Sequence, residues 1–213
     1  MRISIAAAAA LSLVLTAPHA GAAQTASLDL LSRAVDPNPA LNSYTASVQL
    51  SATLHVLIPV HKNFSGTVYY LRPRRKIEFE NVSGALSRFK DLASQTPSYE
   101  QAMKEYTIAP LQDNGTISTY SAVPKKPGGR VKSITLTVTD ATSLIARAQW
   151  AYSNGGSLSF DQNYTNVGQY RLPAKTNIAA RFPGYSVDGT LTFATYRPNS
   201  TVSPSVFASP NPS

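Results

Sequence analysis

The longest regular pattern in the chain is an alternation of apolar and polar residues that runs from Tyr44 to Ile58. In YTASVQLSATLHVLI the even positions are apolar, and the odd positions carry Thr, Ser, Gln or His as far as His55. Successive side chains of a β-strand point to opposite faces of the sheet, so a sustained repeat of two residues predicts one very long strand. We expect its even positions to face an apolar interior.

Other strands surround a single helical interruption. Residues 64–71 and 76–82 have strand character, whereas apolar residues recur at helical spacing between 84 and 105 and predict one or two short helices there. The strand pattern then resumes, with turn signals that include the Asp-Gly pair at 188–189. The later strands are expected at residues 116–122, 131–139, 143–152, 157–166, 175–181 and 190–197. Strands joined by tight turns form a meander, and a meander of this size should curl into a barrel or half-barrel.

The two ends of the chain differ in composition from the part between them. The first residues combine one Arg, a long apolar run and a row of small residues, which is typical of a cleavable secretory signal peptide. The last residues are rich in Pro and Ser and are expected to be disordered. The sequence therefore predicts a signal peptide at 1–22, one domain at 23–198 that begins with a short amphipathic helix at 27–34, and a disordered tail at 199–213.

Composition and charge narrow the class of partner. Removing the signal peptide would leave 18 Lys and Arg against 11 Asp and Glu, a net charge of +7. The chain has no Cys, so the exported domain has to rely on its apolar core, for which 43% hydrophobic residues are enough. A basic protein in the periplasm or outside the cell is suited to anionic lipid head groups or wall polymers, and its compartment argues against nucleic acid. The alternative is that the charge serves solubility alone.

Residues for catalysis or metal binding are scarce. After removal of the signal peptide only His55 and His61 remain as histidines, and neither a Gly-x-Ser-x-Gly nor a His-Glu-x-x-His motif occurs. His55 falls on the polar side of the long strand, where we expect a solvent-facing side chain. The sequence therefore predicts no enzymatic activity, no cofactor and no metal site.

The order of these elements resembles the LolA-like family of periplasmic lipoprotein carriers, also described as outer-membrane lipoprotein-sorting proteins. The resemblance rests on FSGTVYYLRPRRKIEF after the long strand, and on VTDATSLIARAQWAYSNGGSLSFDQNYTNVGQYRLPAKT followed by FPGYSVDGTLTFATYRPN. It covers about residues 28–199. The resemblance implies an α+β fold that is mainly antiparallel β, an unclosed half-barrel of about nine to eleven strands with a short helical lid.

The resemblance also implies a function and partners. A carrier of this kind would shelter the acyl chains of a lipid or a lipidated protein in an apolar cavity. It would act as a monomer and exchange its cargo with membrane-bound donor and acceptor proteins. RseB-like stress sensors use the same fold, so the alternative is an envelope interaction or sensor protein that uses its basic outer surface.

Apolar residues expected on the concave face are the candidates for the lipid-binding cavity. They are Val48, Leu50, Leu54, Val68, Tyr70, Ile77, Phe79, Phe89, Met103 and Trp150. For each of them, packing within the protein core explains an apolar side chain equally well.

The basic turn LRPRRK, residues 71–76, is the candidate for a polar contact. Arg72 and Arg75 are predicted to meet a lipid head group or a carboxylate on the lid. Arg72 is favoured because it matches the Arg-Pro position of the family that the chain resembles. The alternative is a solvated turn whose positive charge discourages pairing with another sheet edge.

Overall fold

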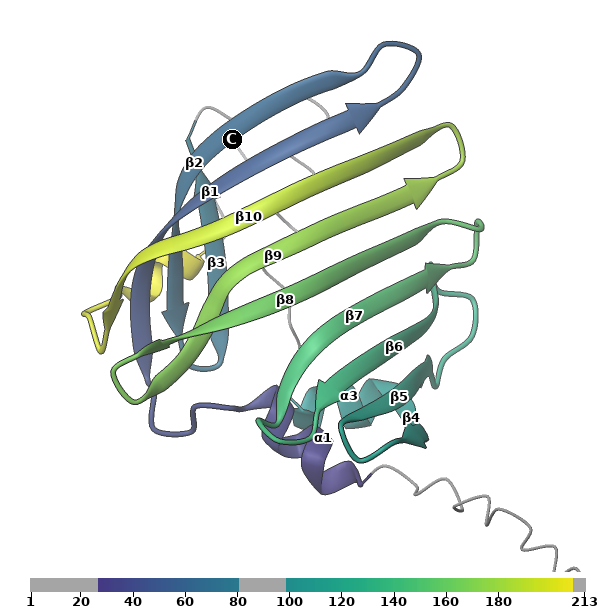
Figure 1. The fold of residues 1–213 in the computed structure, drawn as a ribbon, viewed down its shortest axis with the longest axis horizontal. Helices are drawn as coiled ribbons and strands as arrows, with labels where there is room; N and C mark the ends of the chain where they lie inside the picture. The colour runs from purple at the N-terminus through teal and green to yellow at the C-terminus, as the bar shows by residue number, and fades with distance from the viewer. Residues whose placement is uncertain (1–26, 81–98, 209–213) are drawn as a thin grey trace, which may run out of the picture.

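One curved antiparallel sheet dominates the protein. The computed structural model describes residues 27–80 and 99–208, and Figure 1 shows how they are arranged. The helices are α1 (Leu28–Val35), α3 (Tyr99–Glu105) and the 3-10 helix η2 (Pro204–Phe207). The strands are β1 (Ser43–His55), β2 (Val60–Leu71), β3 (Arg74–Phe79), β4 (Tyr106–Asp113), β5 (Ile117–Pro124), β6 (Val131–Thr139), β7 (Leu144–Tyr152), β8 (Ser157–Val167), β9 (Tyr170–Phe182) and β10 (Tyr185–Pro198). The fold is therefore α+β and mainly antiparallel β, as the sequence predicts.

The strand order places the first and last strands of the domain side by side. The ten strands of the described residues follow the order β3-β2-β1-β10-β9-β8-β7-β6-β5-β4. β1 pairs with β2 on one side and with β10 on the other, where Leu50 lies opposite Leu191. β3 and β4 remain as the two edges, so the sheet curls without closing (Figure 1). The predicted half-barrel is confirmed.

Helix α1 covers the β5–β7 end of the sheet. Ser27 caps it by accepting a hydrogen bond from the backbone N–H of Asp29 at 3.2 Å. Its apolar side is buried, with Leu31 fully enclosed against Tyr120 and Val138. Tyr120 also donates a hydrogen bond to the carbonyl of Ser27 at 2.6 Å, which fixes the start of the helix on the sheet. The short helix that the sequence predicts at this position is therefore present.

The turn between β9 and β10 differs from the prediction. The chain turns at Pro183 and Gly184, whereas the Asp-Gly pair at 188–189 lies inside β10. Gly184 has a φ of +88°, in the left-handed region that favours glycine, so this residue allows the tight turn. Asp188 instead makes a cross-strand ion pair with Arg181 at 2.5 Å.

The first strand is shorter than its alternating pattern. β1 ends at His55, although apolar even positions continue through Val56 and Ile58. His55 lies opposite Ser186, and pairing with β10 ends at this point. Val56 and Ile58 are therefore exposed, which corrects the expectation that all even positions face the interior.

The edge strand β4 is missing from the prediction, which places a strand pattern only after residue 111. Residues 106–113 pair with β5, and the register shifts between Pro110 and Gln112. A proline has no N–H for the ladder and is tolerated at the edge of a sheet, where one side needs no partner. Because of the proline and the adjacent register shift, this strand lacks the strict alternation by which the other strands are recognised.

The segment after β10 packs against β3. Lys76 Nζ donates a hydrogen bond to the carbonyl of Val206 at 2.6 Å, and the guanidinium of Arg74 lies 4.9 Å from the centre of the Phe207 ring. The structure thus differs from the prediction of disorder over residues 199–208. The predicted signal peptide and the last residues of the chain lie outside the described residues, so those predictions stand untested.

Candidate functional site

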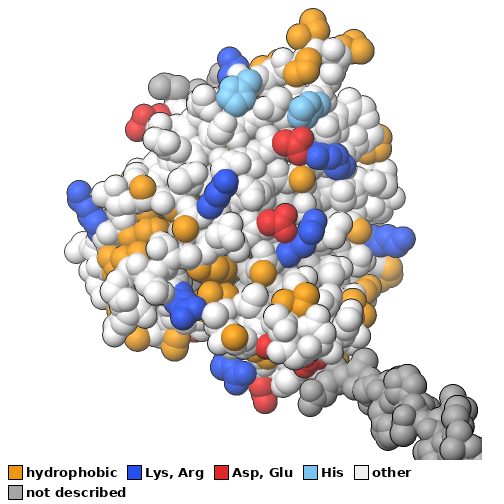
Figure 2. All heavy atoms as spheres, viewed as in Figure 1, with side chains coloured by type: hydrophobic (Ala, Val, Ile, Leu, Met, Phe, Trp, Pro, Cys, Tyr) orange, Lys and Arg blue, Asp and Glu red, His pale blue; other side chains and the backbone are white. Residues whose placement is uncertain are grey.

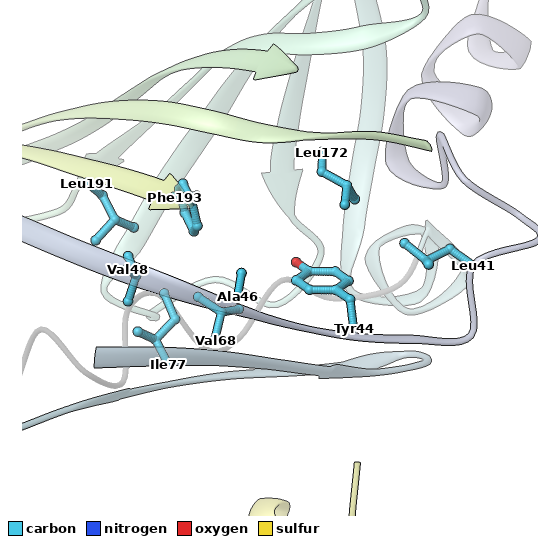
Figure 3. Close-up of a cluster of buried hydrophobic side chains, with 9 residues drawn as sticks. All are labelled: Leu41, Tyr44, Ala46, Val48, Val68, Ile77, Leu172, Leu191 and Phe193. Carbon is cyan, nitrogen blue, oxygen red and sulfur yellow. The ribbon is translucent and has the colours of Figure 1, made fainter. Parts of the chain in front are cut away.

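The concave face of the sheet carries an apolar cluster built around β1. Tyr44, Ala46 and Val48 are exposed by only 4%, 2% and 1%. Figure 3 shows them meeting side chains from β2, β3, β9 and β10. The main cluster consists of Leu41, Tyr44, Ala46, Val48, Val68, Ile77, Leu172, Leu191 and Phe193. Alternate residues of neighbouring strands thus share one apolar face, as the period of two predicts.

A second cluster extends this face toward the β9–β10 turn. Its buried members are Ala52, Leu158, Ala180 and Val187. Leu50 and Ile178 pack against both clusters and join them. The apolar lining therefore continues along most of β1.

The structure gathers most of the predicted cavity residues on this lining. Those in the main cluster or packed against it are Val48, Leu50, Val68, Tyr70, Ile77 and Phe79. Those packed against the second cluster are Leu54 and Trp150. Met103 is half-buried on α3, and Phe89 lies outside the described residues. Contact of these side chains with a ligand remains a prediction.

The basic turn divides its cations between the two faces of the sheet. Arg75 lies directly opposite Tyr70 of β2, and Tyr70 lies opposite Tyr44 of β1. The rings of Tyr70 and Tyr44 stack with their centres 5.1 Å apart on the concave side. Residues opposite one another in an antiparallel pair point to the same face, so Arg75 also points inward. Arg74 and Lys76 have the other parity and point outward.

Arg72 is fully engaged by the connection between α1 and β1. Its Nη1 lies 2.6 Å from Asp36 Oδ2, and its Nη2 donates to the carbonyls of Asn38 at 2.5 Å and Leu41 at 3.0 Å. The hydrogen bond with Asp36 raises the pKa of Arg72. Arg72 therefore ties the end of α1 to the sheet, which leaves Arg75 as the candidate for a head-group contact.

Arg75 is a cation without a carboxylate partner in the described part of the chain. None of the ion pairs formed there includes it. Its Nε is buried and has no hydrogen-bond partner. Its guanidinium lies 5.9 Å from the centre of the Phe193 ring, within the range of a cation–π contact. The side chain as a whole is half-buried, so an anion that reached it could accept a hydrogen bond from the unpaired Nε.

The position of Arg75 depends on the curl of the sheet. Five strand spacings separate β3 from β8 in the strand order. In a flat sheet these spacings would amount to roughly 24 Å. The charge of Arg75 nevertheless acts on the phenol of Tyr164 on β8, and on those of Tyr44 and Tyr196. The curl thus brings tyrosines from three strands within electrostatic range of one cation.

These three phenols are neutral neighbours. Burial raises the pKa of Tyr44, Tyr164 and Tyr196, and the charge of Arg75 lowers each pKa only in part. The pKa of Tyr164 is raised to about 12. Tyr196 donates its hydroxyl hydrogen to the carbonyl of Pro173 at 2.5 Å. Tyr164 likewise donates its hydroxyl hydrogen to the carbonyl of Ile145 at 3.0 Å. These two phenols therefore have no hydrogen left for an anion, and being neutral they do not balance the charge of the guanidinium.

The sequence predicts a role for Arg75 but favours Arg72. It also identifies Tyr70, opposite Arg75, but not Tyr44, Tyr164 or Tyr196 as site residues. The alternation of β3 indicates that Arg75 faces inward, because Ile77 and Phe79, two and four residues further along, are predicted to face inward. The tyrosines are harder to find. They come from strands far apart in the sequence, and a bulge between Asn163 and Tyr164 breaks the simple alternation of β8.

The site has the chemistry of a receptor for an amphiphile. The described residues contain no group of three or more His, Asp or Glu side chains placed to hold a metal ion. What they offer is an apolar wall with one cation set into it. Such a wall can take up alkyl chains, and the cation can bind a carboxylate or phosphate.

Comparison with known proteins identifies the same fold elsewhere. No family model matches the chain, and no curated protein matches its sequence. A proposed outer membrane lipoprotein-sorting protein domain from Vibrio parahaemolyticus is 11% identical with a TM-score of 0.60, covering 84% of this chain and 95% of that one. A DUF1329 family protein from Desulfovibrio piger is 13% identical with a TM-score of 0.52 and the same coverage. A LolA superfamily protein from Nitrosomonas europaea is 10% identical with a TM-score of 0.49, covering 88% and 99%.

These similarities concern the fold. They confirm the predicted resemblance to LolA-like lipoprotein-sorting proteins at the level of architecture. At such identities, the residues of the site have to be interpreted from this chain's own geometry.

Proposed function

We propose that this chain, which has the fold of a lipoprotein-sorting domain, is a carrier that binds a lipid or a lipidated protein on its concave face. The acyl chains would lie along the apolar lining, and the anionic part of the ligand would meet Arg75. The observation that carries this proposal is the buried, unpartnered Nε of Arg75 within an otherwise apolar wall. A core built only for stability gains nothing from such a cation.

The two parts of the site would contribute differently to binding. Burying an alkyl chain contributes about 0.8 kcal/mol for each CH₂ group and needs no specific geometry. A guanidinium forms short, directional hydrogen bonds to carboxylate or phosphate oxygens. The apolar wall would therefore supply most of the affinity, and Arg75 would select ligands with a negative head.

Helix α3 would belong to the lid. Lys125 Nζ donates a hydrogen bond to the backbone carbonyl of Met103 at 2.7 Å, so the end of α3 is tied to the loop after β5. The adaptable side chain of Met103 suits a cover that packs against different ligands. Phe89, the other predicted contact, lies outside the described residues.

The cellular setting follows from the predicted signal peptide at 1–22. The protein would be exported to the periplasm or beyond, act as a monomer, and exchange its ligand with membrane-bound donor and acceptor proteins. No described helix has both the length and the apolarity needed to cross a bilayer. The proposed activity is binding without chemical conversion of the ligand.

The rival function, an interaction or sensor protein that uses the basic outer surface, finds less support in the basic turn. Lys76 lies 2.8 Å from Glu78, and Arg74 stacks on Phe207. These outward cations already have partners within the chain. The exposed loop that contains Lys126 and Arg130 is another basic surface available to such a partner.

The proposal is tested by denaturing extraction and mass spectrometry of lipids from the purified protein, together with titration by single-chain lipids. Anionic and zwitterionic head groups are compared at equal chain length. The variant Arg75→Met should still bind acyl chains but lose its preference for the anionic lipid. Its matched control is Arg74→Met, which removes the outward neighbour and should keep that preference.

Two results would contradict the proposal. One is a purified protein that carries no lipid and binds neither lipid series. The other is an Arg75→Met protein with the head-group preference of the unmodified chain.

A further inference from the structure

The connection between β1 and β2 exposes more apolar surface than a soluble turn requires. Leu57 is 103% exposed and Ile58 is 77% exposed, while Val56 and Val60 are 46% and 40% exposed. Figure 2 shows hydrophobic atoms projecting at the top of the molecule, where Figure 1 places this hairpin. A run of large apolar residues at the outermost point of a protein marks a contact surface. We call residues 56–60 the hairpin tip.

A second hairpin ends beside this tip. The β9–β10 turn joins Val56 and Leu57 in lining a shallow groove. The rings of Phe182 and Tyr185 stack there with their centres 5.3 Å apart, and Tyr185 is 41% exposed. Exposed aromatic and aliphatic side chains from the two hairpins therefore meet at one groove, which His55 and Arg181 also line. We call this the apolar end of the sheet.

Cations lie behind the apolar end in a defined order. Along the β1–β2 ladder, Val60 lies opposite Leu54, and the next two residues of β2 are His61 and Lys62. Lys62 is exposed and follows Val60, the last residue of the hairpin tip, by two residues. Because successive strand residues rise by about 3.3 Å, its long side chain lies close behind the tip. Figure 2 shows both described histidine side chains, in pale blue, next to the projecting hydrophobic atoms.

The second hairpin repeats this order. Arg181 lies opposite Ser186, immediately behind the Phe182–Tyr185 pair. The acidic residue at this end, Asp188, pairs with Arg181 at 2.5 Å and with His55 at 3.0 Å. Between residues 52–62 and 180–188 it is the single carboxylate among four basic side chains. The end of the sheet is thus apolar at its outermost point, aromatic beside it and basic behind it.

We propose that this end of the sheet docks on an anionic membrane surface. Aliphatic side chains of the tip would enter the acyl region, the tyrosine would lie at head-group level, and Lys62 would meet lipid phosphates. A convex tip with a fully exposed leucine fits a deformable bilayer better than a rigid protein partner, which would need a matching cavity. The surface is separate from Arg75 and extends the proposed carrier function to the place where a ligand could be exchanged.

The test is co-sedimentation of the full chain with phosphatidylethanolamine vesicles that contain phosphatidylglycerol. The double variant Leu57→Ser, Ile58→Ser should weaken vesicle binding by at least about tenfold, because it removes the two most exposed apolar side chains. Leu111→Ser is the matched control: Leu111 on β4 is 60% exposed and far from the tip in the sheet order, so its loss should leave binding unchanged. Lys62→Gln should weaken binding by a factor of about five and reduce its dependence on salt.

A labelling experiment reports insertion directly. The chain has no Cys, so Leu57→Cys and Leu111→Cys each provide a single site for an environment-sensitive fluorophore. Emission from position 57 should shift to the blue when vesicles are added, and emission from position 111 should not. Both sites are exposed, so melting curves should match those of the unmodified protein.

Three outcomes would overturn the proposal. In the first, the unmodified protein does not bind the vesicles. In the second, the double variant binds them as well as the unmodified protein does. In the third, Lys62→Gln alone weakens binding. The last result would mean binding by charge without insertion. Lipid retention by the purified protein is measured separately, so failure at the hairpin tip is distinguishable from failure of the concave site.

Discussion

The apolar residues at the even positions of the first strand differ greatly in how far they are exposed. Near its start, Tyr44 and Val48 are almost completely buried, whereas Val56 and Ile58 in the same series are exposed by 46% and 77%. Val48 is flanked by Gly66 on β2 and by Phe193 on β10, but beyond His55 the pairing with β10 has ended. An alternating pattern thus predicts which residues share a face. The neighbouring strands decide whether that face is covered.

Positive charge differs between these two regions in a corresponding way. In the buried region, Arg75 points into the concavity toward neutral tyrosines. At the exposed end, Lys62 and Arg181 lie on the outside, behind an apolar tip. The inward cation suits a ligand that binds inside the protein. The cations behind the exposed tip suit a membrane surface into which the tip inserts.

The largest difference is expected between aspartates placed at the two ends of this series. Val48→Asp buries a carboxylate in the main cluster and should lower the free energy of unfolding by about 4 kcal/mol or more. Ile58→Asp leaves its carboxylate in water and should change that free energy by less than about 0.5 kcal/mol. Urea denaturation followed by circular dichroism compares them, and similar losses would contradict the burial described for this series.

A smaller effect is expected at the strand that carries Arg75. A Cβ on Gly66 would meet the backbone oxygen of Glu78 and would lie 2.9 Å from the Cα of Phe79, so Gly66→Ala should push β3 away from β2. We expect a loss of about 3 kcal/mol in unfolding free energy. Gly129→Ala is the control, because nothing lies within 4 Å of its added Cβ. Equal stability of the two variants would argue against the close β2–β3 contact.

The outer cations of the basic turn provide a weaker test. Arg72→Met removes an ion pair with Asp36 and hydrogen bonds to two carbonyls, so it should cost about 2 kcal/mol of unfolding free energy. Arg74→Met loses the contact with Phe207 and should cost under about 1 kcal/mol. If both variants unfold at the same urea concentration, Arg72 does not have the structural role assigned to it.

The smallest expected effect is a dependence on alkaline pH. Burial raises the pKa of Tyr164 from 10.0 to about 12, so the folded protein keeps this proton when the unfolded chain loses it. The stability contributed by the neutral phenol is complete below pH 10 and is lost as pH rises toward about 12. Tyr164→Phe should therefore flatten the fall in stability over this range. A Tyr164→Phe profile as steep as the original would contradict the burial of this phenol.

The sequence predicts the fold well because most of its signals are local. The period of two places β1 and the inward residues of β2 and β3, and glycine-rich turns separate most of the later strands. Local signals fail where two alternatives compete, as at the β9–β10 turn. An Asp-Gly pair is a good turn sequence, but Asp188 forms a cross-strand pair with Arg181 instead.

The site is less predictable because it depends on curvature. Eight of the ten predicted cavity residues lie on the apolar lining, since parity alone assigns them to one face. The tyrosines around Arg75 depend on how far the sheet curls between β3 and β8, which no local pattern encodes. The preference for Arg72 came from its match to the Arg-Pro position of the family that the chain resembles, whereas its actual contacts are with the α1–β1 connection.

The most direct measurement is photocrosslinking with a fatty acid that carries a diazirine near the end of its chain, followed by mass spectrometry of the modified peptides. We expect adducts on the concave lining, at residues such as Leu50 and Leu191, and loss of these adducts when an unlabelled anionic lipid competes. Adducts confined to outward residues of the sheet, or insensitive to competition, would contradict the claim that this face binds acyl chains.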